Sequence, residues 1–208
     1  ALPQAEIEAA LVEKLRIIGI TGGTGGGKTT VLKELNSLGA LIIDCDELYH
    51  EMLKSNNELL SDIENAFSGV VTDGSLDRKA LGERVFSDEK ALETLNGITH
   101  RHITKEVEKL LADWAMNGGE LAAIDAIALI ESGIGDRCDA VIGVISERET
   151  RIERIMQRDN ISREYAELRV DAQKDNAFFE ENCDKIIHND GTKDEFINNI
   201  KNTLKEVL

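Results

Sequence analysis

The alternation of apolar and polar positions predicts a strand, a helix and a second strand early in the chain. Residues 16–20, RIIGI, are apolar and rich in β-branched side chains, which is typical of a buried strand. After a glycine-rich loop, apolar residues recur at helical spacing through residues 31–38, and Gly39 is a typical helix stop. Residues 40–44, ALIID, predict another buried strand. The span 16–44 therefore predicts one parallel βαβ unit.

The middle of the chain predicts a long helical region. Residues 47–118 contain several segments in which apolar side chains lie three to four positions apart. The next strand-like runs follow only at residues 120–130 and 139–146. Because this separation is too long for a simple crossover, we expect 47–118 to form a helical insertion on the sheet-containing core.

The two ends of the chain complete the predicted α/β architecture. Residues 147–175 are helical in pattern and strongly charged, 184–190 predict a last short strand, and 192–207 predict a closing helix. Residues 1–15 predict a short amphipathic helix or a frayed N-terminal leader without chemistry of its own. We therefore expect a single domain over 16–208 built on a parallel sheet.

Composition and charge limit the classes of partner. The chain has 208 residues, of which 41% are hydrophobic and 31% charged, and its formal net charge is −16. Such an acidic chain repels nucleic acid and anionic lipid, so neither a nucleic acid nor a membrane is expected as a partner. Cys45, Cys138 and Cys183 form no CxxC pair, which argues against a disulfide framework or a zinc site. Without a long apolar run or a signal-peptide profile, a cytoplasmic location is expected.

The glycine-rich loop matches a phosphate-binding motif. In GITGGTGGGKTT, residues 19–30, Gly22 and the triplet Gly27-Lys28-Thr29 fit GxxxxGK[ST], the P-loop, between a predicted strand and a predicted helix. Small residues let successive backbone N–H groups turn toward phosphate oxygens, and the helix start adds its positive dipole end. The expected phosphate-binding residues are Gly22, Gly23, Thr24, Gly25, Gly26, Gly27, Lys28, Thr29 and Thr30. An ordinary glycine-rich turn is the alternative, but it explains neither the lysine nor the helix that follows.

The same motif suggests the ligand and its cation. Lys28 is expected to reach the β- and γ-phosphates of ATP, and the Thr29 hydroxyl is a hard oxygen ligand suited to Mg²⁺. The chain has neither the DxxG and NKxD segments of GTPases nor the LSGGQ-like signature of transporter ATPases. The P-loop class that remains is the small-molecule kinases. In these enzymes a helical insertion holds the acceptor, and an arginine-rich lid closes over the phosphates.

Two aspartates follow the second predicted strand, Asp44 and Asp46. In a parallel sheet they would lie beside the P-loop, at the carboxyl ends of the strands where ligands bind. If the segment stays extended, both carboxylates share a face, and one could accept the proton of an attacking hydroxyl. The alternative is that one of them caps the next helix, since Asp44 and Glu47 have capping-box spacing. Spacing alone leaves both interpretations open.

Arginines are concentrated in residues 147–169. Arg151, Arg154 and Arg158 are three and four positions apart, which places them on one helical face that could neutralise charge on a transferred phosphoryl group. Acidic residues are interleaved, so a solvated, salt-bridged pair of helices is the alternative for each of them. The arginines of this segment are Arg148, Arg151, Arg154, Arg158, Arg163 and Arg169.

From about residue 16 to about residue 200 the chain resembles the dephospho-coenzyme A kinases. The resembling segments are IIGITGGTGGGKTT, LGALIIDCDELYHEML, DGSLDRKALGERVFSDEKALETLNGITHRHI, ALIESGIGDRCDAVIGV, RIERIMQRDNISREYAELRVDAQ and CDKIIHNDG. The resemblance implies a P-loop fold with a five-stranded parallel core, a helical acceptor-binding insertion and an arginine-rich lid at 147–175. It also implies a reaction, in which ATP phosphorylates the ribose 3′-hydroxyl of dephospho-coenzyme A, the last step of coenzyme A synthesis.

The resemblance carries roles to individual positions. It makes Asp46 the expected base or hydroxyl orienter, and Arg158 of the QRDN segment the lid arginine near the transferred phosphate. Arg154 and Arg169 match further positively charged lid positions, and Asn189 of CDKIIHNDG is placed with the nucleotide. Further residues are expected at the acceptor: Asp44, Leu129, Glu131, and His100, which precedes the substrate-domain helix of the family.

The sequence departs from the family in three places. Gly26 stands where serine is usual, and since a backbone donor is retained we expect little change. His100-Arg101 replaces His-Pro, so the turn into the following helix is expected to differ. Residues 127–131 lack the proline of a segment that lines the acceptor pocket.

Two other functions are weighed against this one. The first is a P-loop kinase for another nucleoside or ribosyl acceptor. The second is a non-catalytic nucleotide-binding module, which would be expected to lose Lys28, Asp46 or the lid arginines, whereas all are present.

Overall fold

The computed structural model describes residues 3–86 and 88–208 and divides into two compact units. One unit comprises the residues up to Ile43 together with Ala112–Leu208, and the other comprises Asp44–Leu111. The first unit contains the main sheet, a parallel one of five strands among the described residues, in the order β2-β5-β1-β6-β7. These strands are β1 (Arg16–Thr21), β2 (Leu41–Asp44), β5 (Leu121–Asp125), β6 (Ala140–Ile145) and β7 (Lys185–His188).

The apolar run that starts at Arg16 becomes the central strand. β1 pairs in parallel with β5 on one side, where Ile20 faces Asp125, and with β6 on the other, where Ile20 faces Ile142. Five of its six residues are buried, as a strand covered on both faces requires. The predicted strand–helix–strand elements are confirmed, and in the sheet β5 lies between β1 and β2.

Two amphipathic helices cover one face of the sheet. α2 (Lys28–Ser37) and α10 (Lys193–Val207) bury Val31 and Ile200 in a core cluster with Ile18 and Ile142. α2 ends as expected, since Gly39 has a φ of 89°, a left-handed conformation that disfavours other residues. The closing helix predicted at 192–207 is confirmed, and Thr192 begins it with a capping box.

The opposite face carries a short helix that the apolar pattern did not predict. α9 (Asn176–Asn182) buries Phe179, and a Cβ added at Gly143 of β6 would lie 3.4 Å from the Cβ of Phe179. The strand-like run 120–130 was predicted too long. Only Leu121–Asp125 forms a strand, and a turn leads to the 3₁₀ helix η1 (Ile134–Arg137).

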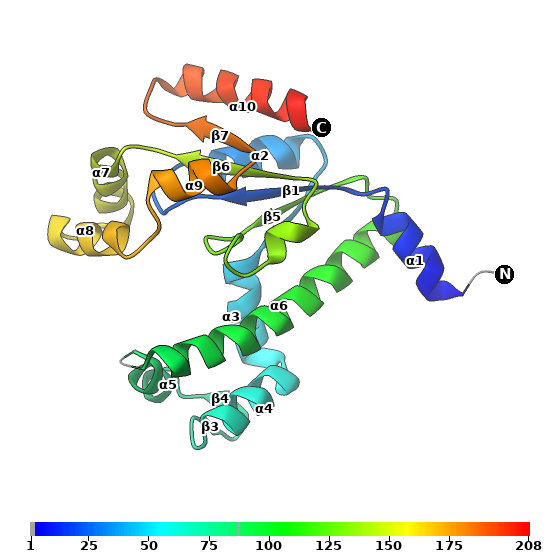
Figure 1. The fold of residues 1–208 in the computed structure, drawn as a ribbon, viewed down its shortest axis with the longest axis vertical. Coiled ribbons are helices and arrows are strands. Elements are labelled where there is room, and N and C mark those ends of the chain that lie inside the picture. The colour runs from blue at the N-terminus through cyan, green and yellow to red at the C-terminus, as the bar shows by residue number, and fades with distance from the viewer. Residues whose placement is uncertain (1–2, 87) are drawn as a thin grey trace. The chain divides into compact units, whose positions relative to one another are not determined.

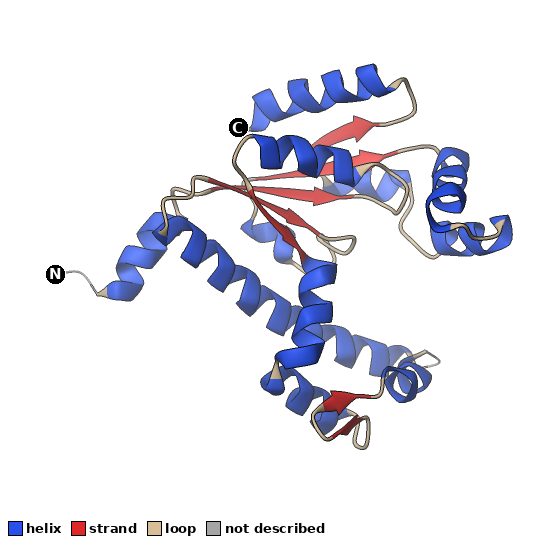
Figure 2. Cartoon of the chain, turned by 180° about the vertical axis from the view of Figure 1, so that it is seen from behind, coloured by secondary structure: helices blue, strands red, loops and turns tan. Residues whose placement is uncertain are grey.

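The charged segment predicted as helical forms α7 (Arg148–Asp159) and α8 (Arg163–Asp171). Ile152 and Ile155 of α7 pack against Ala166 and Val170 of α8 in a small separate core. Asn160 makes the turn between them with a φ of 51°, in the left-handed region that asparagine tolerates best among side-chain-bearing residues. Both helices lie beyond the end of the sheet toward which the strand arrows point (Figure 1 and Figure 2).

The second unit is mainly helical. It contains α3 (Cys45–Ser55), α4 (Asn57–Ala66), α5 (Arg78–Val85) and most of α6 (Glu89–Met116). The helical pattern missed a hairpin of β3 (Val71–Thr72) and β4 (Ser75–Leu76). Its turn is Asp73-Gly74, both at positive φ, and an Asp-Gly pair is the sequence signal that would have predicted it.

The N-terminal segment forms α1 (Gln4–Val12). Of the two expectations for this segment, a short helix or a frayed leader, the helix is confirmed, and none of its residues is buried. Among residues 3–86 and 88–208, no helix has both the length and the apolar character needed to cross a bilayer.

Candidate active site at the phosphate-binding loop

The glycine-rich loop connects β1 to α2 and follows the backbone of β6 closely. A Cβ added at Gly22, where φ is 137°, would lie 2.2 Å from the carbonyl oxygen of Val144. Gly27 has a φ of 111° and immediately precedes α2. At both positions a side chain would be strained by the backbone conformation itself. Gly26 is equally confined, with 2.7 Å between its added Cβ and the Val144 oxygen, so a serine there would shift this loop.

Lys28 is the first residue of α2 and folds back along the loop. Its Nζ donates a hydrogen bond to the carbonyl oxygen of Gly22 at 2.8 Å. Thr29 follows in the first turn of the helix and is exposed. The lysine, a threonine hydroxyl and the positive end of a helix therefore lie together, which is an arrangement suited to phosphate oxygens.

These residues line a cavity of about 340 Å³. Asp125, at the carboxyl end of β5, contributes the carboxylate of this cavity, and Arg154 and Arg158 reach it from α7. The residues that line it are Gly23, Thr24, Gly25, Gly27, Lys28, Thr29, Asp125, Arg154 and Arg158. Asp125 was missed by the sequence analysis. The available signal was an acidic residue at the end of an apolar run, as for Asp44.

The arginines predicted to share one face of α7 all contact the loop. Arg151 Nε donates to the Thr24 carbonyl oxygen at 2.9 Å, and Arg154 Nη1 donates to the Gly25 carbonyl oxygen at 3.2 Å. Arg158 Nη2 lies 3.4 Å from the Thr24 hydroxyl. The prediction that these three side chains lie together is confirmed: Arg151 and Arg154 contact the loop backbone, and Arg158 contacts the Thr24 hydroxyl.

Arg154 and Asn189 belong to one hydrogen-bond network around Ser146. Arg154 donates to the Ser146 hydroxyl at 2.8 Å and to the Asn189 carbonyl oxygen at 2.7 Å. The Asn189 side-chain amide in turn donates to the Gly26 carbonyl oxygen at 3.0 Å. Both residues were predicted to contact the nucleotide, and in the structure they hold the loop that would bind it.

Asp159 accepts hydrogen bonds from two arginines of the lid segment, Arg158 and Arg169. Its carboxylate accepts from Arg158 Nε at 2.7 Å and Nη2 at 3.0 Å, and from Arg169 Nη1 at 2.6 Å. These hydrogen bonds hold the pKa of Asp159 far below its usual range. Arg158 remains largely exposed, with 57% of its side chain accessible, so it is available to a ligand in the cavity.

Asp44 is a helix cap. Its Oδ1 accepts from the backbone N–H groups of Asp46, at 2.9 Å, and Glu47, at 3.0 Å. Because α3 begins at Cys45, the chain is not extended here, and the expected common face of Asp44 and Asp46 does not form. The capping interpretation therefore holds for Asp44. Asp46 lies exposed in the first turn of α3.

A family model described as dephospho-CoA kinase matches residues 16–195. The chain belongs to the dephospho-CoA kinase family. It is 39% identical to the dephospho-CoA kinase of Geobacter sulfurreducens over 183 residues, which cover 87% of this chain and 93% of the relative. The resemblance that the motifs indicated is therefore confirmed. The two alternative functions, a P-loop kinase for another acceptor and a non-catalytic nucleotide-binding module, are not favoured by these findings.

Solved structures agree with the fold of this kinase family. A Thermus thermophilus protein superimposes with a TM-score of 0.76 at 29% identity, over 93% of this chain and 98% of that one. The dephospho-CoA kinase from Campylobacter jejuni gives a TM-score of 0.64 at 28% identity, over 92% and 96% of the two chains. The predicted α/β fold of the P-loop type is confirmed.

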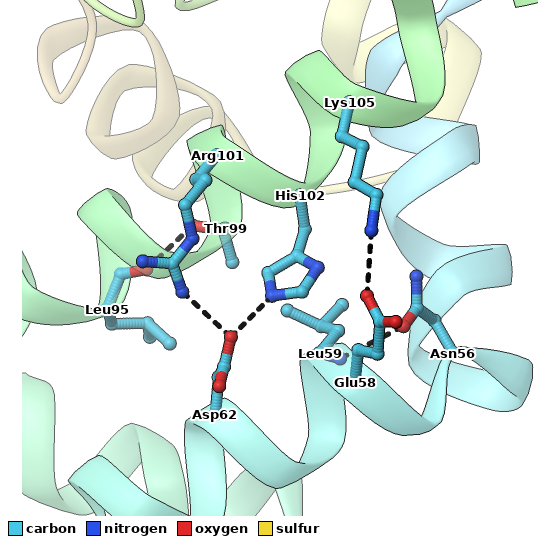
Figure 3. Close-up of polar contacts among 9 residues, drawn as sticks. All are labelled: Asn56, Glu58, Leu59, Asp62, Leu95, Thr99, Arg101, His102 and Lys105. Carbon is cyan, nitrogen blue, oxygen red and sulfur yellow. Dashed lines mark hydrogen bonds and ion pairs between the residues drawn. The ribbon is translucent and has the colours of Figure 1, made fainter. Parts of the chain in front are cut away.

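The family resemblance placed His100 ahead of a helix, which was wrong. His100 lies inside α6, which runs without a break from Glu89 to Met116, so the turn expected there does not exist. The buried histidine of this unit is His102, with 6% of its surface exposed. Its Nε2 lies 2.7 Å from Asp62 Oδ2 on α4, and Arg101 donates to the same oxygen at 2.7 Å (Figure 3). Helical periodicity could have suggested His102, but nothing in the sequence pointed to Asp62 as its partner.

Two further residues expected at the acceptor differ in accessibility. Leu129 has no exposed surface, and its Cδ2 packs so tightly on β1 that a Cβ at Gly19 would lie 2.7 Å away. Leu129 is thus part of the core in this structure, and its contact with the acceptor stays a prediction. Glu131 is exposed on the same turn and stays a prediction.

Proposed function

We propose that this chain transfers the γ-phosphate of ATP to the ribose 3′-hydroxyl of dephospho-CoA, which gives CoA in the last step of its biosynthesis. The observation that carries the proposal is the cavity at the P-loop of a dephospho-CoA kinase family member. It combines backbone donors, Lys28 and two arginines with the oxygens of Thr29 and Asp125. Polyphosphates require such donors, and a phosphate-bound cation requires such oxygens.

ATP phosphates fit the loop from Gly22 to Thr30. Loop N–H groups and the start of α2 would bind the phosphate oxygens, and Lys28 would place a charge on the β- and γ-phosphates. Arg158, held by Asp159 beside the cavity, would neutralise charge that develops on the transferred group. We assign residues 147–175, with α7 and α8, as the lid.

Mg²⁺ fits the donor set of the same cavity. Thr29 and Asp125 would hold it through hard oxygen atoms, and it would neutralise phosphate charge during transfer. No cluster of three or more histidine, cysteine or acidic side chains suited to a metal exists among residues 3–86 and 88–208. That agrees with Mg²⁺, which usually takes one or two protein ligands and completes its shell with phosphate oxygens and water.

The acceptor is assigned to the helical unit. Asp46, exposed at the start of α3, would orient the 3′-hydroxyl and accept its proton, and the cap made by Asp44 fixes the first turn that carries it. We assign the helical insertion, residues 47–118, to acceptor binding, with His100 as a further candidate within it; Glu131, in the other unit, is a separate candidate. We also propose a cytoplasmic location, which suits three cysteines that form no disulfide.

A coupled assay with ATP, Mg²⁺ and dephospho-CoA tests the function directly. We expect stoichiometric formation of ADP and CoA, with the new phosphate on the 3′-oxygen by NMR. A panel of nucleosides and ribosyl compounds tests the competing kinase function, and faster turnover of any of these would overturn the assignment. ATP binding without transfer to any acceptor would indicate a binding module.

Two variants test the cation ligands. Thr29→Val and Asp125→Asn each remove an oxygen ligand or its charge while nearly keeping size, so both are expected to raise the Mg²⁺ concentration needed for half-maximal activity. Thr203→Val, which removes a threonine hydroxyl of α10 that does not line the cavity, is the matched control. An unchanged Mg²⁺ requirement in the first two variants would remove them from the metal site.

A further inference from the structure

Thr24, at the apex of the P-loop, is held by a closed ring of hydrogen bonds. The Gln173 Oε1 accepts from the backbone N–H of Thr24 at 2.8 Å and from Arg151 Nη2 at 2.7 Å. Arg151 Nε completes the ring by donating to the carbonyl oxygen of Thr24 at 2.9 Å. Both main-chain groups of one loop residue are thus fixed by side chains from the lid segment.

The two side chains come from the two ends of the lid. Arg151 lies in the first turn of α7, and Gln173 follows the end of α8. Any displacement of either helix relative to the loop has to break part of the ring. The loop apex and the lid are therefore mechanically linked.

Arg151 is unlike the other arginines of its helix face. It is buried, with 4% of its surface exposed, and its guanidinium donates hydrogen bonds to neutral oxygens of Thr24 and Gln173. Burial lowers the pKa of its guanidinium, although Asp171 opposes this effect. A buried cation among neutral acceptors is costly in free energy, and a phosphate anion bound in the neighbouring cavity reduces that cost.

The loop glycines next to Thr24 are shaped to fit this arginine. A Cβ at Gly23 would lie 2.0 Å from Arg151 Nη2, and one at Gly25 would lie 2.8 Å from the Arg151 carbonyl oxygen. Neither clash involves the cavity itself. Gly25, at a φ of 79° against the backbone of α7, has no room for a side chain, and a side chain at Gly23 would displace the Arg151 guanidinium from its hydrogen bonds.

We infer that Gln173 and Arg151 are positioning residues that hold the P-loop apex in the conformation that binds ATP, an inference that rests on the proposed kinase function. A loop already fixed at Thr24 loses less conformational entropy when phosphates bind. Without the Gln173 oxygen, the Thr24 N–H and Arg151 Nη2 both lose an acceptor, and only the Arg151 Nε hydrogen bond to the Thr24 carbonyl oxygen still holds the apex. The affinity for ATP is therefore expected to fall, because Thr24 lines the phosphate cavity.

Substitutions at Gln173 provide the test. Gln173→Leu removes the acceptor, Gln173→Asn withdraws it by one methylene, and Gln173→Glu retains an acceptor oxygen. We expect the first two variants to weaken ATP binding about tenfold, which corresponds to the loss of one buried hydrogen bond. Gln173→Glu is expected to bind ATP with an affinity near that of the wild type. KM for dephospho-CoA is expected to stay unchanged. Gln157→Leu, at an exposed glutamine of α7, is the matched control.

The measurements distinguish failure of the positioning role from failure of the proposed kinase function. ATP affinity is measured by direct titration without an acceptor, so it reports on the loop even if dephospho-CoA is not the substrate. Melting temperatures are recorded for every variant. Unchanged or tighter ATP binding in Gln173→Leu and Gln173→Asn overturns the inference, as does an equal loss in Gln157→Leu. Restored binding in Gln173→Glu supports it, since a role in stability alone does not require an oxygen at this place.

Discussion

Arg154 donates a hydrogen bond to the main-chain oxygen of Asn189 at 2.7 Å, and so joins the lid helix α7 to the end of β7. The same guanidinium donates to the Gly25 carbonyl oxygen, and the Asn189 amide donates to the Gly26 carbonyl oxygen. The loop is therefore hydrogen-bonded both to α7 and to the residue that follows β7. Of the arginines on this helix face, Arg151 and Arg154 hydrogen-bond to the loop backbone, whereas the largely exposed Arg158 contacts the loop only at the Thr24 hydroxyl, which makes it the best candidate for the transferred phosphate.

Lys28→Ala is expected to abolish turnover while leaving the fold intact. The ammonium acts on phosphate charge inside the cavity, where one electrostatic contact is typically worth about 10²–10³-fold in kcat. The hydrogen bond to the Gly22 oxygen is local, so only a small change in melting temperature is expected. Steady-state rates and thermal unfolding of the same preparation check this. Near wild-type turnover would contradict the P-loop assignment.

Arg158→Lys is expected to lower kcat strongly although the charge is conserved. The guanidinium fork holds both carboxylate oxygens of Asp159 and can present donors to two phosphoryl oxygens, whereas an ammonium cannot match that geometry. The effect is expected in kcat more than in KM for the acceptor, because the contact strengthens in the transition state.

Arg163→Lys is the control for Arg158→Lys, since Arg163 pairs with Glu149 and Glu167 on the exposed surface of the lid segment. A change confined to KM in Arg158→Lys would assign this residue to ground-state binding and leave Arg154 or Arg169 for the transition state.

Asp46→Asn is expected to leave a stable protein that binds both substrates but transfers phosphate slowly. A general base typically contributes about 10²–10⁴-fold, and a loose transition state places the loss at the lower end of that range. Single-turnover rates isolate this step from product release. Normal single-turnover chemistry with intact binding would reject Asp46 as the base.

Asp44→Ala is the comparison for Asp46→Asn. Because Asp44 caps α3, its loss is expected to destabilise the protein by about 0.5–2 kcal/mol. Asp44→Asn, which retains a capping oxygen, is expected to recover most of that stability. A melting temperature that is equal in all three variants would contradict the division of cap and base between the two aspartates.

Asp62→Asn tests the cluster of His102 and Arg101 through its pH dependence. The hydrogen bond from His102 lowers the pKa of Asp62 below its unfolded value of about 3.9, with a smaller contribution from Arg101. The carboxylate therefore stabilises the fold fully above about pH 3.9, and this contribution is lost as pH falls through the lowered pKa. We expect the melting temperature of the variant to lie below that of the wild type at pH 7, and the gap to close toward pH 3.

The control for this measurement is Glu58→Gln, which breaks the exposed pair of Glu58 and Lys105 on the same two helices. Exposed ion pairs contribute little, so its melting temperature should stay near that of the wild type. A gap for Asp62→Asn that does not change between pH 7 and pH 3 would mean that the carboxylate charge is not what stabilises the cluster.

The P-loop and the elements around it were predictable because their signals are contiguous. Strand, glycines, Lys28 and helix occupy one uninterrupted segment, and each residue type acts through its own backbone or its immediate neighbours. The stop at Gly39 and the shared face of Arg151, Arg154 and Arg158 follow from the geometry of a single helix. Such local rules need no knowledge of the rest of the chain.

Only the tertiary structure decided which distant residues complete the site. Asp125 enters the cavity because β5 pairs with β1, a choice of strand order that hydrophobic runs do not encode. Arg151 is buried and Arg158 exposed although both lie on one helix face, because Arg151 packs against Gln173 and the main chain of Thr24, whereas Arg158 reaches the loop only at the Thr24 hydroxyl. His102 is buried against Asp62 because α4 packs on that side of α6. In each case the deciding contact joins residues far apart in sequence, whose meeting depends on how the whole chain packs.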